Sequence, residues 1–274
     1  MPSPTEITVQ QLARLIGTPE APVLIDVCID EDFAEDPRLI PTSIRHPFAD
    51  VAMLAPRLKG QRAVVICHKG RKLSQGAAAV LRACGVNAET LQGGIVAWRD
   101  AGQLLIPAKA IPPRKSDHST VWVTRHRPKI DRIACPWLIR RFIDRSAQFL
   151  FVAPSEVLEV AEKFAAVPFD IEGVFWSHHG DTCTFDTMCA EFGLQTEPLQ
   201  HLAKIVRGAD TNRHDLAPEA AGLLAASLGL SRMYRDDLAQ LEVGMMLYDA
   251  FYRWCRDATD EGHDWPAALS TNPS

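Results

Sequence analysis

The sequence predicts an α/β domain, in which helices cover a parallel sheet, followed by an α+β domain that is mostly helical. Short apolar runs alternate with helical patterns up to residue 106, which is typical of such a parallel sheet. After a proline-containing stretch, helical patterns dominate. The 274 residues and 47% hydrophobic content suffice for two cores. We therefore expect domains at 6–106 and 120–258, a linker at 107–119 and a flexible tail at 259–274.

The elements of the first domain follow from this alternation. Strands are predicted for VLIDV, AVVIC and NAETL, at 23–27, 63–67 and 87–91, and helices at 51–58, 73–85 and 93–102. The stretch IPAKAIPPRKSDHST then indicates an extended linker, because proline and the residue before it both resist helix formation.

The second domain is predicted to contain three strands, at 121–125, 148–152 and 173–179. A helix is expected to begin at Pro136, because proline is well tolerated in the first turn. One apolar helix face near the end of the chain is indicated by residues at spacings of three and four, namely Leu238, Leu241, Met245, Tyr248, Tyr252 and Cys255.

The composition narrows the functional classes. A net charge of -5 argues against a general binder of nucleic acid or membrane surfaces, which would need excess lysine and arginine. The first residues lack the pattern of a signal peptide and no run is long enough to span a membrane, so we expect a soluble cytoplasmic protein. Seven cysteines at irregular spacing, without a C-x-x-C pair, indicate free thiols rather than a disulfide framework.

Cys67 ends an apolar strand and is followed by positive charge and a predicted helix, in AVVICHKGRKLSQGAAAVLRACG. A thiolate is the reactive form of cysteine, and cations and a helix N-terminus both stabilise it. Gly70 permits a loop whose N–H groups turn inward toward an anion. Free cysteines are more often packing residues, but this loop favours chemistry at Cys67.

This segment resembles the active-site loop of the rhodanese sulfurtransferases, in which a cysteine opens a six-residue loop with a central glycine. The stretches VLIDVCIDEDF and LQGGIVAWRDAGQLL resemble two further motifs of that family, in the same order. The resemblance implies that Cys67 takes sulfur from a small anionic donor, holds it as a persulfide and passes it to a thiol acceptor or cyanide, without a cofactor. The loop residues implied to meet the substrate are His68, Lys69, Gly70, Arg71 and Lys72. His68 stands where the family often has arginine, and Cys28 stands where it usually has arginine.

The second domain is rich in charged and metal-capable residues. Seven arginines and aspartates crowd the segment from 125 to 144, which is more often a solvated or salt-bridged face than an anion site. Metal-capable side chains follow in WSHHGDTCTFD and IVRGADTNRHD, and we select His178, Cys183 and Asp210 as candidate ligands of a metal ion of unknown identity. Satisfied polar residues are an equally good interpretation, because no standard zinc spacing is present. His178 and His179, neighbours on a predicted strand, would point to opposite faces.

Four blocks of this half resemble the C-terminal domain of bacterial chromate-resistance proteins of the ChrB type: TRHRPKIDRIACPWLIRRFID, FDIEGVFWSHHGDTCTFD, IVRGADTNRHDLAPEAAGLLAASLGLSRMYRDD and MMLYDAFYRWC. The resemblance implies a role in chromate resistance or sensing, with chromate or another oxyanion as a partner. That type normally carries a different N-terminal domain, so the resemblance does not by itself imply transcriptional regulation.

Two functions from different classes remain. We expect a rhodanese-type sulfurtransferase that forms a persulfide on Cys67 and supports chromate resistance or detoxification. The alternative is a non-catalytic rhodanese module for sensing or docking, joined to a domain that binds a metal or an oxyanion. A metalloenzyme centred near His178 is a third interpretation.

Overall fold

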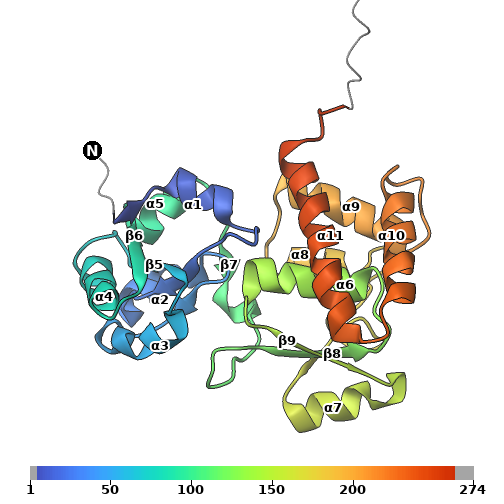
Figure 1. Ribbon diagram of the computed structural model, residues 1–274, viewed down its shortest axis with the longest axis horizontal. Helices are drawn as coiled ribbons and strands as arrows, with labels where there is room; N and C mark the ends of the chain where they lie inside the picture. Colours follow the sequence, from blue (N-terminus) through green and yellow to red (C-terminus); the bar gives the residue numbers. More distant parts are fainter. Residues whose placement is uncertain (1–4, 263–274) are drawn as a thin grey trace, which may run out of the picture.

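The computed structural model describes residues 5–262 and shows two domains side by side (Figure 1). The first domain is built on a five-stranded sheet with the order β1-β6-β5-β2-β4, and all four strand pairs are parallel. The strands are β1 (Glu6–Ile7), β2 (Val23–Asp26), β4 (Ile44–Arg45), β5 (Arg62–Ile66) and β6 (Asn87–Leu91). This arrangement confirms the predicted α/β class.

Helices cover both faces of this sheet. Helices α1 (Val9–Leu15) and α5 (Gly94–Asp100) pack on one face, while α4 (Lys72–Ala83), α3 (Ala55–Leu58) and a 3-10 helix, η1 (Phe48–Leu54), pack on the other. The remaining elements are α2 (Asp30–Glu35) and an antiparallel pair, β3 (Arg38–Leu39) with β7 (Ile106–Pro107). The helix predicted at 51–58 is thus half 3-10, at 51–54, and half α-helix, at 55–58.

The central strand β5 divides the two cores, because successive side chains of a strand point to opposite faces. Val64 and Ile66 belong to the core that includes α1 and α5, whereas Val65 and Cys67 belong to the core that includes α4. The first of these cores continues into the second domain and includes Trp122 there.

The second domain has a three-stranded parallel sheet, β10-β8-β9, with α7 on one face and the other helices on the opposite face (Figure 1). The strands are β8 (Val121–Arg125), β9 (Gln148–Val152) and β10 (Val167–Pro168). The helices are α6 (Asp131–Leu138), α7 (Val157–Phe164), α8 (Thr184–Glu191), α9 (Glu197–Asp210), α10 (Ala220–Met233) and α11 (Asp237–Asp257). A π-helical turn, η3 (Ile139–Ile143), extends α6, and η2 (Ala108–Ala110) and η4 (Pro154–Glu156) are short 3-10 turns. The mostly helical α+β prediction is therefore confirmed.

Two local predictions for this domain were wrong. The helix begins at Asp131, so Pro136 lies inside it rather than at its start. No strand forms at 173–179: this segment makes single bridges, Phe169 to Trp176 and His179 to Thr182, and its backbone turns at Gly173, where φ is +80°.

The two domains contact each other closely. A Cβ atom on Gly17 would lie 2.5 Å from the ring of Phe142, and the Thr42 amide donates a hydrogen bond to the Phe142 carbonyl oxygen (2.9 Å). Inside the predicted linker, Arg114 donates to the carbonyl oxygen of Ile143 (3.0 Å) and pairs with Asp144 (3.2 Å). The end of the linker is therefore attached to the second domain. Part of the predicted tail, 263–274, lies outside the described residues, and no helix within 5–262 is long and apolar enough to cross a membrane.

Candidate functional site

Cys67 directly follows β5 at the carboxyl edge of the parallel sheet, where ligands bind in open α/β folds. Its thiol lies 3.1 Å from the hydroxyl of Ser74, the third residue of α4. No side chain caps α4, so the N–H groups of its first turn lack the acceptor that a capping residue would supply. The sulfur therefore lies at a helix end that favours negative charge.

The loop that begins at Cys67 is packed tightly against the start of α5. The amide groups of Ile95 and Val96 donate hydrogen bonds to the carbonyl oxygens of Cys67 and His68, each at 3.1 Å. Because a trans peptide points its N–H opposite to its C=O, the next two N–H groups of the loop face away from α5. Gly94, with φ of +63°, makes this contact possible: a Cβ there would overlap the Cys67 oxygen and lie 2.7 Å from the His68 oxygen.

The basic residues of the Cys67 loop differ in their exposure to solvent. Lys69, Arg71 and Lys72 are exposed, whereas His68 is half-buried with its Nδ1 3.9 Å from a carboxylate oxygen of Asp32. Gly70 adopts a φ of +65° that favours glycine. The positive charge of the loop therefore faces solvent around a thiol-bearing residue that is itself 4% exposed.

Cys28 lies two residues after β2, which pairs with the strand that leads to Cys67. Burial and the charge of Asp26 raise the pKa of the Cys28 thiol, which disfavours its reactive form. The guanidinium of Arg45 donates to the Cys28 carbonyl oxygen (3.0 Å) and pairs with Asp30 (2.8 Å). Arg45 thus places a positive charge next to Cys28, the position at which the family usually has an arginine.

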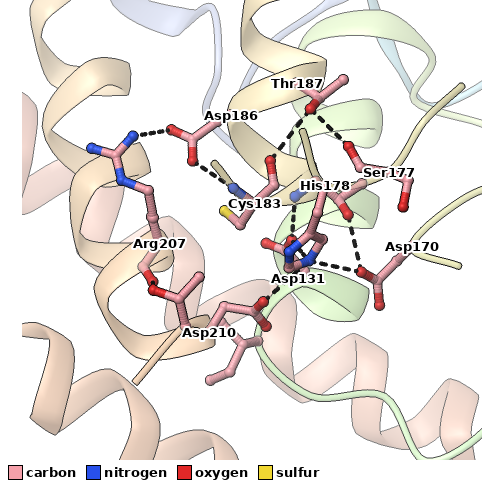
Figure 2. A network of polar contacts seen from close by, with 12 residues as sticks. Asp131, Asp170, Ser177, His178, Cys183, Asp186, Thr187, Arg207 and Asp210 are labelled. Carbon is pink, nitrogen blue, oxygen red and sulfur yellow. Dashed lines mark hydrogen bonds and ion pairs between the residues drawn. The ribbon is translucent and has the colours of Figure 1, made fainter. Parts of the chain in front are cut away.

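A second cluster lies in the other domain, where three carboxylates converge on the ring of His178 (Figure 2). Nε2 of His178 is 3.4 Å from Asp131, 3.3 Å from Asp170 and 3.3 Å from Asp210. The aspartates come from three separate segments: the first residue of α6, the loop after β10 and the last residue of α9. Among the described residues, Asp131, Asp170 and His178 form a group whose ligand atoms all lie within 4.8 Å of one another.

Neighbouring groups orient these carboxylates. The Thr184 amide donates to Oδ2 of Asp131 (2.6 Å), and the Thr184 hydroxyl donates to Oδ1 of Asp170 (2.9 Å). Arg125 and Arg132 each lie 3.2 Å from Oδ2 of Asp170. The side chains are therefore held in place before any ligand arrives.

The environment shifts the ionisation of the cluster. Burial raises the pKa of Asp131 to about 7, and the Asp170 and Asp210 charges add to this rise. Although burial opposes it, the contacts with His178 and Thr184 lower the pKa of Asp170. The carboxylates of Asp131, Asp170 and Asp210 beside its Nε2 raise the pKa of His178 to about 12. The cluster is thus a concentrated negative site with one imidazole at its centre.

Comparison with protein-family models matches residues 8–101 to the rhodanese-like domain and residues 122–255 to the C-terminal domain of ChrB. The chain combines a rhodanese-like domain with a ChrB C-terminal domain. Both predicted resemblances are therefore confirmed. Protein ChrB of Cupriavidus metallidurans is 37% identical over 133 residues, which are 48% of this chain and 39% of that protein.

Two solved structures of rhodanese-like proteins each match about a third of the chain. A rhodanese-related protein from Thermoplasma volcanium is 24% identical, with a TM-score of 0.32 over 37% of this chain and 96% of that chain. A rhodanese-like domain protein from Staphylococcus aureus is also 24% identical, with a TM-score of 0.31 over 34% of this chain and 90% of that chain.

The ChrB C-terminal domain brings together only part of the ligand set expected from the sequence. His178 and Asp210 meet, and His179 faces elsewhere, with its Nε2 3.2 Å from the Phe175 carbonyl oxygen. Cys183 is fully buried outside the group of three and caps α8, with its amide donating to Asp186 (3.0 Å).

Sequence reasoning missed Asp131 and Asp170 as members of this cluster. The charged run at 125–144 predicts a solvated or salt-bridged face, but Asp131 is fully buried. Its place one residue away from the apolar run IACPWLI, with only Arg132 between them, was the available signal, since an aspartate in a buried first turn needs a partner. Asp170 carried no such signal, because its role depends on the fold around β10.

Proposed function

We propose that Cys67 is the nucleophile of a rhodanese-type sulfurtransferase. The observation that carries this proposal is the position of the Cys67 sulfur at the uncapped N-terminus of α4, 3.1 Å from the Ser74 hydroxyl. A helix N-terminus stabilises a negative sulfur, and this applies to the thiolate and to the persulfide anion that follows it.

The reaction needs no group beyond the chain, the donor and the acceptor. The Cys67 thiolate attacks the outer sulfur of thiosulfate, a sulfur–sulfur bond forms, and sulfite leaves with the electron pair of the bond that breaks. The terminal sulfur of the resulting persulfide is then attacked by cyanide or an acceptor thiolate. The acceptor gains the sulfur, and the Cys67 thiolate is regenerated with its electron pair.

The exposed cations of the loop support an anionic donor. Lys69, Arg71 and Lys72 face solvent around the sulfur, so they can attract a dianion such as thiosulfate before it reaches Cys67. Their exposure to solvent suits attraction of the donor.

The ChrB C-terminal domain supports a role for this activity in chromate resistance. The fusion joins a thiol site to a domain type that resembles chromate-resistance proteins. We propose that sulfur transfer at Cys67 aids recovery from this oxidising anion. Cells that produce the Cys67→Ser variant would then grow less well on chromate than cells that produce the same amount of the unchanged protein.

The decisive experiment measures thiosulfate:cyanide sulfurtransfer by the full chain. Cys67→Ser is expected to abolish turnover, whereas Cys84→Ser, which removes an exposed thiol of the same domain, should retain it. Mass spectrometry after incubation with thiosulfate should show an added sulfur of about 32 Da on Cys67. Equal rates for the unchanged protein and Cys67→Ser would refute catalysis and favour a non-catalytic docking or sensing module.

A further inference from the structure

The contacts around His178 cannot all be hydrogen bonds of that residue. Three carboxylate oxygens, from Asp131, Asp170 and Asp210, lie 3.3 to 3.4 Å from the single atom Nε2. That nitrogen carries at most one hydrogen, so it can donate one good hydrogen bond. All three distances exceed the usual range of about 2.7 to 3.2 Å for such a bond.

The same spacing fits a shared cation. Ligand atoms about 2.1 Å from a metal ion in a tetrahedral site lie roughly 3.4 Å from one another. The separations of His178 Nε2 from Asp131 and Asp170 match this value, and the three ligand atoms all lie within 4.8 Å of one another. The three aspartates around His178 come from segments far apart in sequence, so their convergence is a property of the fold.

A second observation independently indicates a missing partner. Asp131 is completely buried, and its Oδ1 has no hydrogen-bond partner among the described residues. Its other oxygen, Oδ2, accepts the Thr184 amide and faces His178 (Figure 2). A buried carboxylate oxygen without a partner costs free energy unless a cation or donor satisfies it.

The cluster is open on one side. Asp170 and His178 line a cavity of about 650 Å³, together with Arg125 and Ser177, and 41% of the His178 side chain is exposed. An ion could enter from this cavity, and a coordination position facing it would stay free. Three protein ligands with one free position is the arrangement of catalytic rather than purely structural metal sites.

We propose that Asp131, Asp170 and His178 bind a divalent first-row transition metal ion, with Asp210 beside His178 as a further negative charge near the ion rather than a ligand. The donors are imidazole nitrogen and carboxylate oxygen, which suit Zn²⁺, Fe²⁺ and Mn²⁺, whereas Mg²⁺ prefers oxygen alone. Thr184 and Arg132 hold the two buried carboxylates in position, as partners of metal ligands commonly do. The site is independent of Cys67, so the two proposals can fail separately.

The test removes metal from the full chain with a chelator and then titrates it with Zn²⁺ and with Mn²⁺. Calorimetry measures the stoichiometry and affinity of binding. One metal ion should bind per chain, and His178→Ala should weaken binding at least about tenfold. His179→Ala is the matched control, because it removes the neighbouring imidazole, which lies outside the group of three, and it should bind as the unchanged protein does. Failure of the unchanged protein to bind either ion, or equal affinity of His178→Ala, would overturn the proposal.

A Co²⁺ spectrum identifies the ligands without relying on a variant that folds. Cobalt bound by imidazole and carboxylates gives weak visible bands only. An intense sulfur-to-cobalt band would mean that a thiol such as Cys183 is a ligand, which contradicts the proposed set. Asp210→Asn changes a residue at the end of α9 and gives a second variant, in which Zn²⁺ should bind more weakly while the circular dichroism spectrum stays unchanged.

Discussion

Replacing Gly94 by alanine should disrupt the Cys67 loop. The new Cβ would overlap the carbonyl oxygen of Cys67 and lie 2.7 Å from that of His68, and the φ of +63° is unfavourable for alanine. Left-handed backbone costs about 1 to 2 kcal/mol. If the loop moves away to relieve the overlap, the two hydrogen bonds from the start of α5 are lost, at about 1 kcal/mol each. We therefore expect a loss of about 3 to 4 kcal/mol in the free energy of unfolding.

Urea denaturation of the full chain measures this loss, and Gly76→Ala provides the control. Gly76 lies in α4 with nothing within 4 Å of its added Cβ, so alanine should stabilise the helix by about 1 kcal/mol. Gly94→Ala should also reduce sulfurtransfer while Gly76→Ala retains it. A change of less than about 1 kcal/mol in Gly94→Ala would refute the reasoning about backbone packing.

Three further changes test other contacts. Asp249→Ala should lower the free energy of unfolding by about 2 to 4 kcal/mol, because Arg141 donates two 2.7 Å hydrogen bonds to Asp249 and would be left unpaired. As a control, Glu242→Ala removes an exposed carboxylate and should lower the free energy of unfolding by less than about 1 kcal/mol. Burial raises the pKa of Asp26, so its contribution to stability is greatest in acid and is lost as pH rises through the folded-state pKa. Asp26→Asn should therefore gain stability relative to the unchanged protein as pH increases, and a stability difference that is the same at about pH 4 and about pH 8 would contradict this. Gly17→Val should loosen the contact between the domains, and limited proteolysis should then cut the linker faster; an unchanged rate would count against a tight interface.

The fold of the first domain could be predicted because its signals are local. A strand, Cys67, Gly70 and a helix follow one another within one short segment, so both the element order and the candidate reactive residue are visible in sequence. The β-strand expected at 173–179 does not form, for a tertiary reason. The apolar side chain of Trp176 is accounted for by its stacking on Phe192, not by an alternating pattern in a sheet.

The cluster in the ChrB C-terminal domain could be predicted only in part. His178 and Asp210 belong to conspicuous polar segments, but their partners lie at positions 131 and 170 and are brought in by α6 and the loop after β10. Sequence spacing carries no information about such convergence. Cys183 was selected by residue type, whereas its actual environment is the buried start of α8.

The alternation along β5 separates two classes of mutation. Changes at Val64 or Ile66 reach the core that runs into the second domain, so their effects should spread to distant helices. Changes at Val65 reach the smaller core that holds Cys67, so their effects should remain near the thiol. Neighbouring positions in one strand would thus give either a global stability phenotype or a local reactivity phenotype, and a mutational scan should alternate between them from residue to residue.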